Sequence, residues 1–199
     1  MNILIVGDSF AADWSVKPGN VPLGWPNLLS KKYNVVNIAQ AGVSEYKILQ
    51  QVRSFPDLTE FDVVIISHTS PTRLHTKQHP VHKTGLHKNA DLIFSDIAWH
   101  SSRPLNFFNK ALQSAYNYFV YHYDREYYEE IYELIYNEIT KILDESGVKV
   151  IVVDGFNSNP DADIDLYSIK QKNPGDNNHL DLNGSRIAYD RIVAKLNEL

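Results

Sequence analysis

Residues 1–10, Met1-Asn2-Ile3-Leu4-Ile5-Val6-Gly7-Asp8-Ser9-Phe10, hold an apolar run that ends abruptly at a glycine. Such a run predicts a buried strand of a parallel sheet, and Gly7 lets the chain turn sharply at the end of that strand. Open α/β sheets bind ligands at the carboxyl ends of their strands. A serine in this turn has its hydroxyl near the first amides of the next helix, which suits a nucleophile whose oxyanion needs backbone donors. Alternatively, Asp8 or Ser9 only caps that helix.

The rest of the chain alternates predicted strands with predicted helices. We expect further strands at residues 33–39, 61–66 and 148–154, with a weaker candidate at 163–169. We expect helices from about residue 24 and over 44–55, 107–123, 124–146 and 183–199. Residues 75–106 are polar and predict an irregular loop. The alternation predicts a doubly wound α/β fold, in which right-handed crossovers bring the carboxyl ends of the strands to one edge.

Composition narrows the class of protein. The 199 residues suit one domain, 1–199, with a long loop and a helical insertion at about 74–146. The net charge of −5 disfavours nucleic acid as a partner, because neutralising phosphates needs a basic surface. The absence of cysteine excludes a disulfide framework, a thiolate metal site and a cysteine nucleophile. No signal peptide or membrane-spanning run is visible, so we expect a soluble cytoplasmic protein without a membrane partner.

A serine nucleophile needs a base, and the base benefits from an acid that orients it. Among the eight histidines, His179 stands out because Asp176 lies three residues before it in a turn-rich segment. A carboxylate at that spacing can reach one edge of the imidazole and leave the other nitrogen free. The pair precedes the last predicted helix, on the edge where we expect Ser9. Alternatively, the segment is a turn whose polar groups only satisfy the backbone.

Taken together, these motifs resemble those of the GDSL, or SGNH, hydrolase family. The resemblance rests on Gly7-Asp8-Ser9-Phe10, on Gly42 after the second strand, and on Asp176 and His179 before the last helix. It implies a three-layer sandwich with a flavodoxin-like, mostly parallel sheet, and hydrolysis of an ester or amide without a cofactor. In this family pattern Ser9 is the nucleophile, His179 the base and Asp176 its orienting partner. The amides of Ser9 and Gly42 then serve as oxyanion donors.

The sequence departs from the family after the third strand. The family usually has Gly-x-Asn-Asp there, with the asparagine as a third oxyanion donor, whereas this chain has His68-Thr69-Ser70-Pro71-Thr72-Arg73. We expect the hydroxyl of Thr69 or Ser70 to replace the asparagine. Arg73 either binds a carboxylate or phosphate of the substrate or forms a structural ion pair. Asp8, beside the nucleophile, is a further candidate for substrate binding.

The leading prediction is a serine esterase that works through an acyl-enzyme and removes a small acyl group, such as acetyl, from a carbohydrate. Because an imidazole with an ordinary pKa of about 6.5 is the base, activity should rise through neutral pH. Two alternatives stay open. One is an acyltransferase with the same triad, and the other is a binding protein that receives an anion at the Gly7 turn without a covalent step.

Two further features of the sequence concern metal binding and assembly. The histidines at 75, 79, 82 and 87 suggest a metal cluster, since imidazole suits zinc. Only His75 and His79 have helical spacing, and Pro80 opposes a helix there, so we expect a polar lid and no metal. The tyrosine-rich run at 116–136 mostly has helical spacing and should pack over the sheet. Surplus tyrosines on its outer face would favour a homo-oligomer.

Overall fold

A five-stranded sheet organises the molecule. The computed structural model describes residues 1–14, 24–156, 159–175 and 179–199. The strands pair in the order β2-β1-β3-β4-β5, and every pair is parallel. They are β1 (Asn2–Gly7), β2 (Asn34–Asn37), β3 (Val63–His68), β4 (Lys149–Asp154) and β5 (Ile164–Asp165). This is the flavodoxin-like strand order, which confirms the predicted α/β fold.

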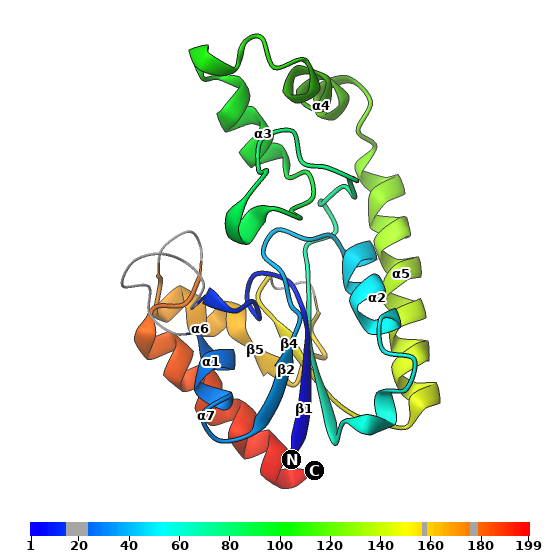
Figure 1. Ribbon diagram of the computed structural model, residues 1–199, viewed down its shortest axis with the longest axis vertical. Helices are drawn as coiled ribbons and strands as arrows, with labels where there is room; N and C mark the ends of the chain where they lie inside the picture. The colour runs from blue at the N-terminus through cyan, green and yellow to red at the C-terminus, as the bar shows by residue number, and fades with distance from the viewer. Residues whose placement is uncertain (15–23, 157–158, 176–178) are drawn as a thin grey trace.

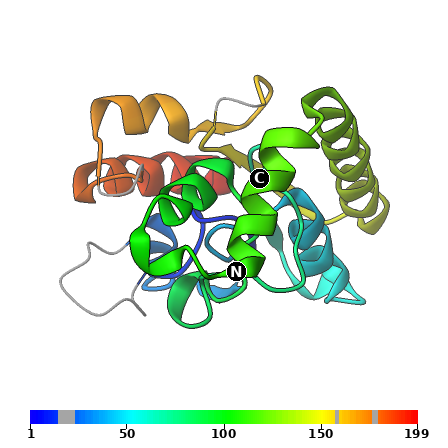
Figure 2. The same ribbon diagram turned by 90° about the horizontal axis from the view of Figure 1, so that it is seen from above.

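Helices cover both faces of the sheet (Figures 1 and 2). One face carries α1 (Trp25–Leu29), α6 (Leu166–Lys172) and α7 (Leu182–Glu198). The other carries α2 (Glu45–Arg53) and the long α5 (Arg125–Ser146), with the short turn η2 (Leu58–Glu60) at one end. Among the described residues, none of the helices has the length and apolarity that crossing a bilayer requires.

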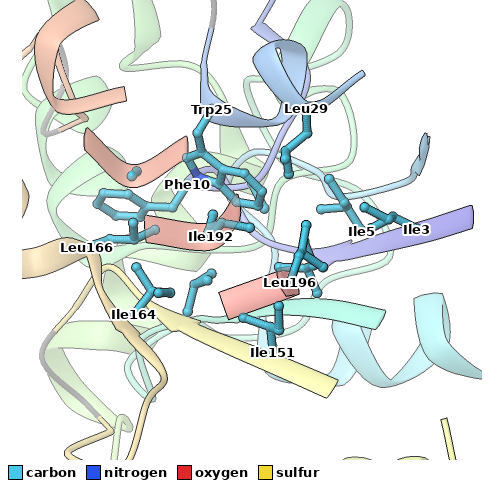
Figure 3. Close-up of a cluster of buried hydrophobic side chains, with 14 of the residues drawn as sticks. Ile3, Ile5, Phe10, Trp25, Leu29, Ile151, Ile164, Leu166, Ile192 and Leu196 are labelled. Atoms are coloured by element: carbon cyan, nitrogen blue, oxygen red, sulfur yellow. The ribbon is translucent and has the colours of Figure 1, made fainter. Parts of the chain in front are cut away.

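Strand β1 is almost continuously apolar because helices cover both of its faces. Ile3 and Ile5 face one helical layer, in the cluster that also holds Trp25 and Leu29 of α1 (Figure 3). The alternating residues Leu4 and Val6 pack against α2 and α5 on the other face. Both sides of the strand are fully buried, so both must be apolar, as expected of a central parallel strand.

Residues 74–123, here called the cap, stand beyond the carboxyl edge of the sheet, away from both chain termini (Figure 1). The cap contains η3 (Gly85–His87), α3 (Phe94–Ser101), η4 (Pro104–Asn106) and α4 (Lys110–Tyr121). It has a small core of its own, made by Leu74, Ile97, Leu112 and Phe119. The prediction of an irregular loop over 75–106 is therefore wrong at α3. That helix exists because Ile97 is buried in the cap core, a tertiary contact that a short mixed segment does not reveal.

The predicted strand at 163–169 is also wrong beyond its first residues. Strand β5 ends at Asp165, and α6 begins at Leu166. The Asp165 side chain accepts a hydrogen bond from the Ser168 amide at 2.8 Å, which caps the new helix. Leu166 and Ile169 then point to the same buried side with helical spacing.

Candidate active site

The turn after β1 has a conformation that only glycine tolerates. Gly7 has a φ of 136°, and a Cβ atom there would lie 2.4 Å from the Ser67 carbonyl oxygen. The Gln51 side chain of α2 holds this turn through two hydrogen bonds. It accepts from the Gly7 amide at 2.6 Å and donates to the Gly7 carbonyl at 3.1 Å. The turn is therefore held by β3 and by α2, which positions Asp8 and Ser9 at the carboxyl edge.

Ser9 lies at the wall of a cavity beside that edge. Its Oγ donates to Asp8 Oδ2 at 3.3 Å, and its carbonyl accepts from Trp14 Nε1 at 2.9 Å. The cavity has a volume of about 510 Å³ and lies between the edge of the sheet and the cap. Four residues that the sequence singled out line it together: Ser9, Gly42, Arg73 and His179. They come from segments far apart in the chain, so only the fold brings them together.

His179 packs against the residues that follow the serine. Its ring lies 5.2 Å from the Phe10 ring and 4.6 Å from the Trp14 ring, between centroids. Its carbonyl accepts a hydrogen bond from the Gly175 amide at 2.8 Å. The structure thus places His179 and Ser9 in one cavity. Asp176, the predicted orienting acid, lies outside the described residues.

Gly42 is the second residue that the site holds in a glycine conformation. Its φ is 78°, and a Cβ atom there would lie 2.8 Å from the Ala90 Cβ of the cap. Its carbonyl accepts from the Asp91 amide at 2.8 Å. The loop after β2 is therefore in close contact with the cap where it lines the cavity.

Asp8 and Arg73 form a buried ion pair behind the serine. Arg73 Nη2 lies 3.3 Å from Asp8 Oδ2, and Arg73 Nη1 donates to the Val43 carbonyl at 2.9 Å. Asp8 Oδ1 accepts from the Phe10 amide and from Ser67 Oγ, both at 3.0 Å. Burial raises the pKa of Asp8, although the Arg73 guanidinium and these hydrogen bonds oppose the rise. Burial likewise lowers the pKa of Arg73, against the pull of Asp8.

This pairing bears on two sequence-based expectations. The sequence leaves two roles open for Arg73: binding of a substrate anion, or a structural ion pair. The structure contains an ion pair with Asp8 and also places Arg73 at the cavity wall. Asp8, a candidate for substrate binding, is fully buried, and its carboxylate oxygens already accept hydrogen bonds from the turn and from β3.

The residues expected to replace the family asparagine lie elsewhere. Thr69 is fully buried, and its amide donates to Glu45 Oε2 at 3.1 Å. The other oxygen of Glu45 lies 2.5 Å from His68 Nδ1, a buried pair that anchors this segment. Ser70 lines a second cavity of about 240 Å³, next to α5. Thr72, in the same segment, does line the cavity of Ser9.

Several residues of the cavity were not expected from the sequence. Lys170 of α6 lies over the Phe10 ring at 5.4 Å, and burial lowers its pKa although Asp154 and Asp8 oppose this. From the cap come His82, His87 and Asp96. For these histidines the sequence suggests a metal cluster or a polar lid, and it does not place them beside Ser9. Their place over Ser9 follows from the path of the cap, for which local sequence carries no signal.

The fold and the cavity define a class of protein: a flavodoxin-like α/β sandwich with a serine-bearing turn after β1, covered by a helical cap. Solved structures share this fold. A catalytic mutant of Axe2, an acetylxylan esterase from Geobacillus stearothermophilus, aligns over 98% of this chain and 93% of its own, with 11% identity and a TM-score of 0.51. At this identity the likeness shows the fold alone, and it agrees with the architecture expected from the GDSL or SGNH resemblance.

Two other structures align more loosely, each with a TM-score of 0.42. The esterase EstA from Pseudoalteromonas sp. is 13% identical, over 99% of this chain and 97% of its own. A lipase/acylhydrolase from Enterococcus faecalis is 14% identical, over 98% and 94%. No protein-family model and no curated protein sequence matches the chain.

Proposed function

We propose that the protein is a serine esterase that hydrolyses a carboxylic ester through an acyl-enzyme. One observation carries the proposal: Ser9, Gly42 and His179, from three distant segments, line a single cavity. These are the nucleophile, an oxyanion donor and the base of the resemblance described above. Asp176 is the proposed partner that orients His179, on the ground of its spacing in the sequence.

In the proposed reaction His179 accepts the Ser9 proton while Oγ attacks the ester carbonyl carbon. The amides of Ser9 and Gly42 donate to the oxyanion of the tetrahedral intermediate. His179 then gives the proton to the leaving alcohol, and the acyl group stays on Ser9. Water attacks next, His179 takes its proton, and the acid leaves as the proton returns to Ser9. Each step balances without a cofactor.

Thr72 is the proposed third oxyanion donor. It lines the same cavity as Ser9, whereas Thr69 and Ser70, the two candidates from the sequence, do not. Its Oγ1 lies 2.9 Å from Ser70 Oγ, so its hydroxyl already has a neighbour that can hold its orientation. This assignment keeps the donor in the segment where the family has its asparagine.

The proposed substrate is a small acyl ester, such as an acetyl group, on a carbohydrate. The cavity of about 510 Å³ combines aromatic rings, Phe10, Trp14 and Phe156, with polar groups from α6 and the cap. Such a mixture suits a sugar, which presents apolar faces and hydroxyl edges. Axe2, whose structure aligns with this chain, is an acetylxylan esterase, which is consistent with this substrate class.

The test is a panel of p-nitrophenyl esters from acetyl to octanoyl, run on wild type, Ser9→Ala and His179→Ala. We expect turnover to be greatest with the acetyl ester and to fall at least a thousandfold in both variants. Thr140→Ala, on the surface of α5, is the control. A fluorophosphonate probe should label wild type and not Ser9→Ala. Wild type that is neither labelled nor active would favour the binding protein, and faster acyl transfer to an added sugar than to water would favour the acyltransferase.

A further inference from the structure

A cluster of metal-ligating side chains lies in the cap. His79 and His82 come from the loop before η3, and Asp96 comes from the first turn of α3. One ligand atom from each of the three lies within 4.8 Å of the others. His82 Nε2 is 3.0 Å from Asp96 Oδ2, and His79 Nε2 is 3.4 Å from the same oxygen. Two imidazoles from a loop thus converge on one carboxylate from a helix.

The surroundings of His79 point to a missing ligand. The residue is only 1% exposed, and among the described residues its Nε2 makes no hydrogen bond of good geometry, although Asp96 Oδ2 lies 3.4 Å away. A buried nitrogen without a hydrogen bond is energetically unfavourable. A metal ion bound to Nε2 would account for it. The ring is also held in orientation. Its Nδ1 accepts from the amides of Val81 and His82 at 3.2 and 3.0 Å, which aims Nε2 toward Asp96.

Two of the three separations between the ligand atoms are close to the edge of a tetrahedral site. Zinc binds imidazole nitrogen and carboxylate oxygen at about 2.0–2.1 Å, so two ligand atoms of a tetrahedral site lie about 3.3 Å apart. The separations of the two imidazole nitrogens from Asp96 Oδ2, 3.0 and 3.4 Å, lie on either side of that value. His100 adds support from α3, since its Nε2 lies 3.6 Å from Asp96 Oδ1, the other carboxylate oxygen. A ligating carboxylate is commonly held in this way by a second side chain.

We propose that His79 Nε2, His82 Nε2 and Asp96 Oδ2 bind a divalent transition-metal ion of the zinc class, with His100 orienting Asp96. Two imidazoles and one carboxylate suit zinc better than calcium or magnesium, which prefer all-oxygen sites. The fourth position is left for water or a ligand oxygen. Because His82 and Asp96 line the cavity of Ser9, the ion lies where the cap borders that cavity.

Binding requires a change at His79. While Nδ1 accepts two amide hydrogen bonds, the neutral ring carries its proton on Nε2. The ion displaces that proton, and Nδ1 carries a proton in its place, so the ring stays a neutral imidazole and the two amide hydrogen bonds to Nδ1 are lost. A bond from zinc to nitrogen more than offsets two neutral hydrogen bonds.

The ion would also serve the cap as a crosslink. The buried core of the cap is small, and two histidines of the loop at residues 79–82 contact Asp96 of α3. Small units with little core commonly gain stability from a structural metal. Asp96 and His100 are four residues apart on α3. The sequence does not indicate that they are neighbours, because it predicts an irregular segment over residues 75–106 and no helix there.

The experiment uses the full chain, stripped with dipicolinate and then titrated with Zn²⁺ by calorimetry and with Co²⁺ by visible absorption. We expect one ion per chain, a Kd below 1 μM, the absorption bands of tetrahedral Co²⁺, and a higher Tm with zinc. His82→Gln and Asp96→Asn should each weaken binding at least a hundredfold. The control is His122→Gln, at the exposed end of α4, which should bind as wild type does.

Circular dichroism must show that the variants fold, and His100→Gln, a milder change, should weaken binding about tenfold. Two results would overturn the proposal: no stoichiometric binding by the stripped wild type, or binding that His82→Gln leaves unchanged. Ser9→Ala should bind zinc as wild type does, so the test is independent of the esterase proposal.

Discussion

Asp8 Oδ2 receives both the Arg73 guanidinium and the Ser9 hydroxyl, at 3.3 Å each. The candidate nucleophile is therefore hydrogen-bonded to a carboxylate that is itself neutralised by a buried cation. This arrangement orients Ser9 Oγ, and in the proposed reaction the guanidinium would limit the repulsion between the carboxylate and the oxyanion. Arg73 also lies 4.9 Å from the Phe156 ring, between the guanidinium carbon and the ring centroid, so it connects the turn after β1 to the cavity wall beyond β4.

Removing one partner of this pair should cost much stability. Arg73→Met leaves the Asp8 carboxylate buried without its cation, and losses of about 3–5 kcal/mol are typical of such a change. The measurement is the free energy of unfolding in urea. The control is Arg125→Met. Its pair with Glu129 lies at the surface of α5, with the two side chains 74% and 41% exposed, and its loss should cost less than about 1 kcal/mol. Equal losses in the free energy of unfolding of the two variants would show that the buried pair contributes no more to stability than the surface pair.

The turn at Gly7 gives a second stability prediction. Gly7→Ala places a Cβ 2.4 Å from the Ser67 carbonyl oxygen in a left-handed backbone, so β1 and β3 must separate. We expect a loss of at least about 3 kcal/mol or no folded protein. Gly147→Ala is the matched control, because that glycine also has a positive φ of 69° but faces open space. It should cost only about 1 kcal/mol. Thermal unfolding of both variants checks the difference.

These contacts also show what the sequence can and cannot predict. Strands β1 and β3 are predictable because both faces are buried, so a local apolar run is enough. The Gly7 turn and the position of His179 on the same edge follow from a short motif and the crossover rule. Helix α3 escapes prediction because Ile97 is buried by other parts of the cap. The same holds for His82 and Asp96, which face the cavity only through tertiary structure.

The Asp165 side chain caps α6 where it follows β5. Burial tends to raise the pKa of Asp165, but hydrogen bonds from Ser168 and Tyr167 outweigh it and hold the pKa below its usual range. A folded-state pKa below the unfolded value of about 3.9 means that ionised Asp165 stabilises the fold above that pH. This stability is lost as pH falls through the lower, folded-state pKa.

Asp165→Ala should therefore lower the free energy of unfolding by about 1 kcal/mol at pH 7, the usual loss for an N-cap. The difference from wild type should shrink as the pH falls below about 4. Asp165→Asn keeps a capping oxygen without the charge, so it should retain most of the stability and lose the pH dependence. Urea titrations at pH 3, 5 and 7 measure this. A difference that stays constant with pH would contradict a role for the charge.

The third oxyanion donor can be identified by exchanging one hydroxyl for a methyl group. Thr72→Val keeps the shape of the side chain and removes the proposed donor, so kcat should fall about tenfold to a hundredfold with KM nearly unchanged. Thr69→Val is the matched comparison. In the described part of the chain Thr69 Oγ1 is buried without a hydrogen-bond partner, so a methyl group there should be neutral or stabilising. If kcat falls in Thr69→Val and not in Thr72→Val, the donor is the residue expected from the sequence. A donor strengthens its bond as charge develops, so the loss must appear in kcat, whereas a residue that only shapes the cavity would change KM.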